Sequence, residues 1–231
     1  MLIVRFVVTL TVNTVLFWAL ILGPAWAVTG RLDWPRGWLA FGVWFAASAI
    51  GGLWFLVTDP GLVRERASVP RTQSREDTRA TLLIGLAVVV WMAAASVDGA
   101  RFHLLTPPGP AASLAVGLAL FLFGLAVIVW TFRVNSFAAL VVKVQSERHQ
   151  RVIDTGPYAF VRHPMYFGAI PFLAGTAMIL ESTAMALVAV PLFVVVFLPR
   201  IAVEERDLRR DLEGYAEYQE RVRARILPGL F

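Results

Sequence analysis

Long runs of uncharged, apolar residues dominate this sequence and restrict what it can fold into. A helix that crosses a bilayer needs about 20 mostly apolar residues, because lipid offers no partner for an unpaired backbone N–H or C=O group. The hydrophobic fraction of 58% and the mean hydropathy of +0.69 fit that environment. We therefore predict an all-α integral membrane protein with about six hydrophobic helices. The runs that predict them are Phe6–Val28, Trp38–Val57, Ala80–Val97, Ala111–Phe132, Pro164–Leu180 and Ser182–Pro199.

The last two runs are short and are separated only by Glu181. Each contains a proline, Pro171 or Pro191, so their crossings can be kinked or incomplete. We predict a tight helical hairpin with Glu181 as an interfacial residue of its turn. After the hairpin, residues 201–225 place apolar side chains at roughly helical spacing among many charges, which predicts a C-terminal amphipathic helix on the cytoplasmic surface.

The loop arginines predict the orientation, because short cytoplasmic loops hold the excess of Lys and Arg. Only Arg31, Arg36 and Arg101 fall on one side. The other side collects Arg5, Arg64, Arg66, Arg71, Arg75, Arg79, Lys143, Arg148, Arg151, Arg162 and the basic tail. Both termini are therefore expected in the cytoplasm, and the high Arg-to-Lys ratio favours a bacterial inner membrane. This topology, together with contact with anionic lipid, accounts for the pI near 10.4 without nucleic acid.

Metal and thiol chemistry are not expected. The sequence has no cysteine, which excludes disulfides, thiolate metal sites and cysteine nucleophiles. His103, His149 and His163 are scattered, and none has a second histidine at helical spacing to complete a metal site. We predict no bound metal.

The chain divides into two parts. Residues 1–134 form four hydrophobic helices, and the turn signal Asp59-Pro60-Gly61 ends the second of them. Residues 135–231 are expected to form the functional core. Within it, two Val- and Ile-rich stretches, 138–145 and 150–153, flank a polar turn and predict a short hairpin.

A segment from Gly156 to Tyr166 is the first candidate site. Gly156-Pro157 makes a rigid turn, and Pro164 suits the first position of a helix. The helix N-terminus presents unpaired N–H groups and positive dipole beside Arg162 and His163, which predicts a site for a carboxylate. The alternative is that Arg162 snorkels to lipid phosphate and His163 merely caps the helix.

The adjacent acids Glu204 and Glu205 are the second candidate. Two neighbouring carboxylates can stabilise an ammonium, a sulfonium or a pair of ribose hydroxyls. Alternatively, they pair at the surface with nearby arginines, namely Arg206, Arg209 and Arg210. Asn135 and Phe137, which follow the fourth span, are candidates for the substrate side of the same pocket, although Asn135 also fits an ordinary helix terminator.

These strings, in this order, resemble the isoprenylcysteine carboxyl methyltransferase family, with phospholipid N-methyltransferases as more distant relatives. The match runs from Gly156-Pro157-Tyr158 through Val-Arg-His-Pro-Met-Tyr-Phe-Gly at 161–168 and Glu204-Glu205 to the closing Leu-Pro-Gly-Leu-Phe. It covers about residues 135–231, and the segment 59–66 is similar to one in bacterial members. The resemblance implies S-adenosylmethionine as cofactor, bound by Tyr158, Val161, Arg162, His163, Pro164, Met165, Tyr166, Glu204 and Glu205. Leu198 is a further candidate, as a cover for the adenine.

Methyl transfer from a sulfonium is an in-line displacement, so the protein mainly aligns the nucleophile in a dry pocket. Arg162, His163 and Glu205 are the candidate catalytic residues, with His163 or Glu205 as a possible base. The sequence thus predicts methyl transfer to a lipophilic or lipid-linked carboxylate, amine or thiol, provided that the helix mouth at 162–164 and the acids at 204–205 meet in space. Two alternatives stay open. Some sterol reductases resemble this C-terminal region and bind NADPH, and a small transporter or assembly factor is the non-enzymatic alternative.

Overall fold

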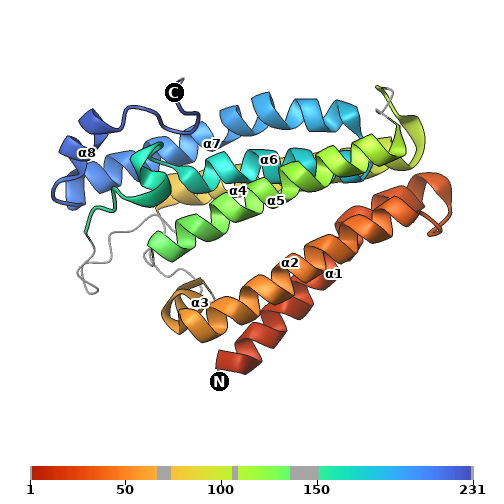
Figure 1. The fold of residues 1–231 in the computed structure, drawn as a ribbon, viewed down its shortest axis with the longest axis horizontal. Coiled ribbons are helices and arrows are strands. Elements are labelled where there is room, and N and C mark those ends of the chain that lie inside the picture. The colour runs from red at the N-terminus through yellow and green to blue at the C-terminus, as the bar shows by residue number, and fades with distance from the viewer. Residues whose placement is uncertain (1, 67–73, 106–108, 136–150, 230–231) are drawn as a thin grey trace.

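The computed structural model describes residues 2–66, 74–105, 109–135 and 151–229. These residues form helices and connecting turns, with no strand among them (Figure 1). The predicted stretch 138–145 lies outside them, and residues 151–153 are irregular. The helical elements are α1 (Leu2–Thr29), α2 (Pro35–Thr58), α3 (Pro60–Arg66), α4 (Arg75–Val97), η1 (Asp98–Phe102), α5 (Pro110–Val134), η3 (Gly156–Ala159), α6 (Pro164–Ile179), α7 (Thr183–Asp211) and α8 (Tyr215–Arg221).

The predicted all-α membrane fold is confirmed. In the described part of the chain, five helices are long and apolar enough to cross a membrane: α1, α2, α4 with η1, α5 and α7. The sixth hydrophobic helix, α6, has 16 residues and is therefore about 24 Å long. It is buried along most of its length at the centre of the bundle, so neighbouring helices rather than lipid cover its apolar side chains.

The predicted hairpin of the last two apolar segments is present. Leu180–Ser182 forms the turn between α6 and α7, with Glu181 at a φ of +65°. The tail differs from the prediction, because α7 continues without a break to Asp211 and only the short α8 lies apart. The chain leaves the helix near Gly214, whose φ of +81° suits glycine. A separate helix from residue 201 does not form, because nothing between 201 and 211 interrupts the helix.

Close backbone contact between α5 and α6 defines the centre of the bundle. Gly117 and Gly124 on α5 face Gly175 and Gly168 on α6, and both pairs are seven residues apart. A Cβ atom added at Gly124 would lie 2.4 Å from the carbonyl oxygen of Gly168, and one at Gly175 would lie 2.6 Å from that of Gly117. Small residues at such spacing let membrane helices approach closely, so van der Waals contact and buried backbone stabilise the pair.

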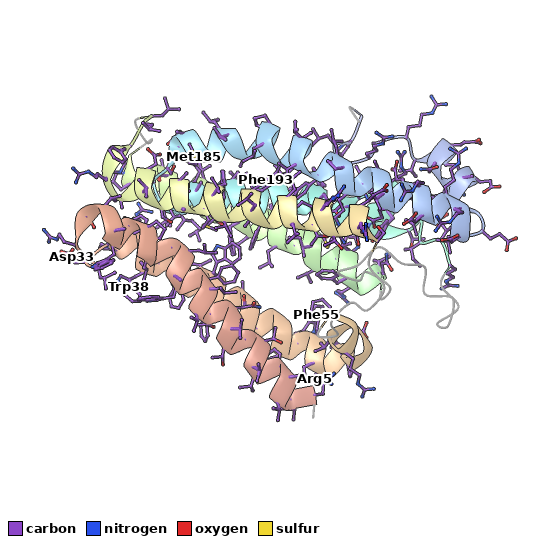
Figure 2. The ribbon with its side chains drawn as sticks, turned by 180° about the vertical axis from the view of Figure 1, so that it is seen from behind. Arg5, Asp33, Trp38, Phe55, Met185 and Phe193 are labelled. Carbon is purple, nitrogen blue, oxygen red and sulfur yellow. The ribbon has the colours of Figure 1, made fainter. Side chains whose placement is uncertain are left out.

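On the other flank, α4 packs along α7. The Trp91 and Phe193 rings meet edge to face with centroids 5.5 Å apart, and the Trp91 Nε1 donates to the Met185 carbonyl at 3.0 Å. Figure 2 shows Met185 and Phe193 on α7 beside α4, whereas the α1–α2 hairpin diverges from the bundle toward Arg5 and Phe55. We call the end of the bundle that contains α3, the starts of α4 and α6, and α8 the basic end (Figure 1).

Polar contacts close the opposite end of the bundle. The buried carboxylate of Asp98 accepts from the Ser182 hydroxyl at 2.5 Å and from the Leu104 N–H at 2.7 Å. Arg36 pairs with Glu181 at 3.2 Å. The α6–α7 turn is thus joined both to α2 and to the segment that follows α4, which gives Glu181 the structural role predicted for it.

We expect Gly124→Ala to destabilise the bundle by about 1–3 kcal/mol, because its added methyl meets backbone atoms that cannot move independently. Gly85→Ala on α4 is the matched control, since nothing lies within 4 Å of a Cβ there. Thermal unfolding in detergent, followed by tryptophan fluorescence, should show a lower Tm only for Gly124→Ala. Equal transitions in the two variants would contradict the close-contact interpretation.

Candidate functional site

The start of α6 is shaped by its local sequence as predicted. Gly156 adopts a φ of +61°, the turn η3 follows, and α6 begins at Pro164 with His163 as its N-cap. Proline suits this first position because its missing N–H would have no partner within the helix anyway. Val161 and Arg162, just before the cap, are both buried.

Arg162 joins three separate segments of the chain at the basic end. Its Nε donates to Glu205 Oε1 at 2.7 Å, and its Nη1 donates to the carbonyl oxygens of Val222 at 2.6 Å and Arg223 at 2.8 Å. The side chain is only 7% exposed, so it does not snorkel to lipid. The helix mouth and the acidic pair meet in space, and they do so in direct contact.

Glu205 is surrounded by nitrogen donors. In addition to Arg162, His163 Nε2 lies 3.2 Å from Oε1 and Arg225 Nε lies 3.3 Å from Oε2. The alternative in which Glu205 pairs with the arginines that follow it is wrong. Arg206 instead contacts Glu76 at 2.6 Å. A buried carboxylate with three such partners fixes their positions and has little freedom to act on another molecule.

Glu204 is the more accessible acid of the pair. Its side chain is 32% exposed, against 8% for Glu205. Its Oε2 lies 3.7 Å from His163 Nδ1. The two ring nitrogens of His163 thus face two different carboxylates, which fixes the ring between them.

The tail lies against the segment that precedes α6. The backbone N–H groups of Arg162 and His163 donate to the carbonyls of Ala224 and Arg225, both at 2.9 Å. This backbone pairing holds residues 224–225 beside the start of α6. The tail is therefore a wall of the site and is fixed by main-chain hydrogen bonds as well as by charge.

Tyrosine hydroxyls form the side of the site nearest α5. Asn135 Nδ2 donates to the Tyr158 hydroxyl at 2.7 Å, and the Tyr218 hydroxyl donates to the Tyr158 carbonyl at 2.8 Å. Burial raises the pKa of both Tyr158 and Tyr218, so both stay neutral at physiological pH. Asn135 also ends α5 as its C-cap, which is the helix-terminator role, and its role toward a substrate stays a prediction.

The remaining predicted residues occupy different environments. Tyr166 is buried and stacks on Phe197 with ring centroids 4.6 Å apart. Met165 is half-buried against the core. Leu198 is half-exposed and lies seven residues before Glu205, on the same face of α7. Phe137 lies outside the described residues.

A second buried ion pair beside the site was not predicted from the sequence. Arg200 Nη1 on α7 lies 3.2 Å from Asp77 Oδ1 on α4, and both side chains are less than 10% exposed. Two local features of the sequence could have drawn attention to Asp77 and Arg200. Ser74 and Asp77 have the spacing of an N-terminal capping motif, and the Asp77 N–H does bond the Ser74 hydroxyl at 3.1 Å. Arg200 precedes Glu204 by four residues and so shares its helix face.

Comparisons with known proteins find likenesses in the C-terminal part of the chain. Residues 112–213 match the family model described as phospholipid methyltransferase. Over 89 residues the chain is 32% identical to Protein-S-isoprenylcysteine O-methyltransferase B of Arabidopsis thaliana, a match that covers 38% of this chain and 45% of the relative. The chain thus spans about half the length of the curated relative it matches. The resemblance inferred from the motifs is confirmed.

We expect Glu205→Gln to lower the free energy of unfolding by about 3–5 kcal/mol, because it leaves the buried Arg162 without its counter-charge. Glu204→Gln makes the same chemical change at the more exposed neighbour and should cost no more than about 1 kcal/mol. Thermal unfolding and limited proteolysis of the tail would measure both effects. Similar losses in the two variants would show that Glu205 does not hold the site together.

Proposed function

We propose, from the likeness of residues 112–213 to the phospholipid methyltransferases, that this chain is a membrane methyltransferase that uses S-adenosylmethionine. The observation that supports it best is the cluster in which the buried Arg162, His163 and Glu205 meet the half-exposed Glu204. These residues come from the start of α6 and the end of α7, both within the matched segment. We further propose that the basic end faces the cytoplasm, in accord with the distribution of arginines.

The residues around the cluster fit the parts of this cofactor. Two nitrogens of Arg162 are engaged, and in the described part of the chain Nη2 has no hydrogen-bond partner. It is therefore available to a carboxylate. The half-exposed Glu204 suits an ammonium or ribose hydroxyls, and Tyr158 and Leu198 are candidates to cover an adenine. S-adenosylmethionine would supply a methyl group on a sulfonium.

The protein residues would mainly bind, orient and exclude water. Because the ring nitrogens of His163 face Glu204 and Glu205, we assign His163 and Glu205 positioning roles instead of proton abstraction. The buried Tyr166 and Phe197 would keep the pocket dry on the membrane side. An acceptor that is already nucleophilic, such as a carboxylate, needs no base and fits this arrangement.

The acceptor is proposed to be a lipophilic or lipid-linked small molecule that approaches from the bilayer. The matched family model is named for a phospholipid and the Arabidopsis relative for an S-isoprenylcysteine, and both are lipid-borne groups. A site at the end of apolar helices places the reacting group at the membrane surface while its chain stays in the hydrocarbon.

We expect the purified protein to bind S-adenosylhomocysteine in calorimetry, and Glu204→Gln to weaken this binding at least about tenfold through loss of one charged hydrogen bond. Glu213→Gln, an exposed acid in the turn before α8, is the matched control and should bind normally. Arg162→Lys keeps the charge but loses the planar fork, and it should also weaken binding. Binding of NADPH but not of S-adenosylhomocysteine would instead favour the reductase alternative.

Methyl transfer itself can be tested with S-adenosylmethionine that carries a label in its methyl group, incubated with the protein and a native lipid extract. Label should enter the organic phase with the unchanged protein and the Glu213→Gln variant, and much less with Glu204→Gln. Identification of the labelled product would define the acceptor. Cofactor binding without any labelled lipid would contradict a lipid-borne acceptor.

A further inference from the structure

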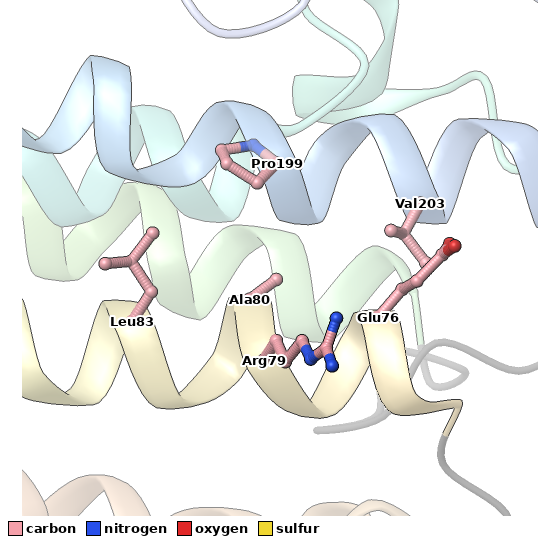
Figure 3. Close-up of a pocket in the computed structure, with 6 residues that line it drawn as sticks. All are labelled: Glu76, Arg79, Ala80, Leu83, Pro199 and Val203. Carbon is pink, nitrogen blue, oxygen red and sulfur yellow. The ribbon is translucent and has the colours of Figure 1, made fainter.

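A crevice lies between α4 and α7 near the basic end (Figure 3). Its volume is about 310 Å³. Glu76, Arg79, Ala80 and Leu83 line it from α4, and Pro199 and Val203 line it from α7. None of these six residues is among those assigned to the candidate methyl-transfer site.

The sequence explains why the two helices leave space here. Ala80 has a small side chain, and Pro199 lies inside α7, where its ring displaces the preceding turn of a helix. Residues 76, 80 and 83 share one face of α4, as 199 and 203 do on α7. Asp77 and Arg200 lie next to these residues in the sequence and form the buried ion pair behind the crevice.

The charges beside the crevice are not balanced. Glu76 is paired with Arg206 on α7 at 2.6 Å. Arg79, one turn further along α4, is exposed and has no ion pair with any described residue. Figure 3 shows both Glu76 and Arg79 extending from α4 beside the apolar lining. An arginine without an ion pair among the described residues therefore lies beside an apolar groove, at the point where the uncharged part of α4 begins with residue 80.

We propose that this crevice binds one anionic phospholipid of the surrounding membrane. A guanidinium matches a phosphate with two parallel hydrogen bonds, which a general surface charge does not provide. The apolar lining formed by Ala80, Leu83, Pro199 and Val203 would contact an acyl chain of the same molecule. Anionic lipids concentrate at the membrane face that attracts basic segments, so the ligand is available at this depth.

Binding there would join α4 to α7 directly over the Asp77–Arg200 pair. The lipid would stabilise the packing of the helix that carries Glu204 and Glu205 without contacting them. The inference is independent of the proposed methyl transfer, because it concerns fold stability and lipid retention. Phosphatidylglycerol is a suitable probe, since it has neither an amine nor a carboxylate to accept a methyl group.

The test uses the full chain, delipidated in a neutral detergent, with phosphatidylglycerol or phosphatidylcholine added. We expect phosphatidylglycerol to raise the Tm more than phosphatidylcholine does and to remain bound in native mass spectrometry. Arg79→Ala should bind phosphatidylglycerol at least about tenfold more weakly. Arg75→Ala, the same charge loss on an exposed arginine one turn earlier on α4, is the matched control and should bind as the unchanged protein does.

A second variant tests the apolar half of the site. Leu83→Trp fills the crevice without changing any charge, so it should weaken phosphatidylglycerol binding while Arg79 is intact. Equal loss in Arg79→Ala and Arg75→Ala would show general surface attraction and overturn the proposal. An equal response to phosphatidylcholine, or an equal rise in Tm with inorganic phosphate alone, would overturn it as well.

Discussion

The ion pair between Arg162 and Glu205 is the interaction on which the arrangement of the candidate site depends. The two side chains meet at 2.7 Å with less than a tenth of either exposed. Each has further partners, which are tail carbonyls for Arg162, and His163 and Arg225 for Glu205. A buried pair satisfied in this way is costly to disrupt, because any loss leaves a charge in a medium of low dielectric constant. The start of α6, the end of α7 and the tail are consequently fixed relative to one another.

Close packing of α5 against α6, further along the bundle, fixes the helix that follows Arg162. The glycines that bring α5 against α6 leave no room for side chains between the two backbones. The buried α6 therefore has a fixed axial position, which sets the height at which His163 and Pro164 emerge. Asp98 and Ser182, at the opposite end, hold the turn that connects α6 to α7. Both ends of the α6–α7 hairpin are thus fixed by polar contacts, and its middle is fixed by shape.

Two polar regions at the basic end have different characters. The cluster around His163 lies inside the bundle and has one half-exposed acid, Glu204, as well as a guanidinium nitrogen of Arg162 without a partner among the described residues. The crevice lined by Arg79 and Leu83 lies between α4 and α7. The Asp77–Arg200 pair joins α4 to α7, and the Arg200 side chain is also hydrogen-bonded to Tyr166.

The sequence by itself determined the membrane class, the apolar helices and the turn at Glu181, because these follow from the length of uncharged runs and from local helix signals. It also singled out Arg162, His163, Glu204 and Glu205, since their residue types stand out at helix ends. Only the tertiary structure decided their partners, because an ion pair between residues 162 and 205 depends on how α6 packs against α7. For the same reason the Asp77–Arg200 pair was not foreseen. The continuation of α7 to Asp211 is instead a local feature, because no residue between 201 and 211 interrupts the helix. Side-chain type reveals which groups need a partner, and packing alone decides which partner lies within reach.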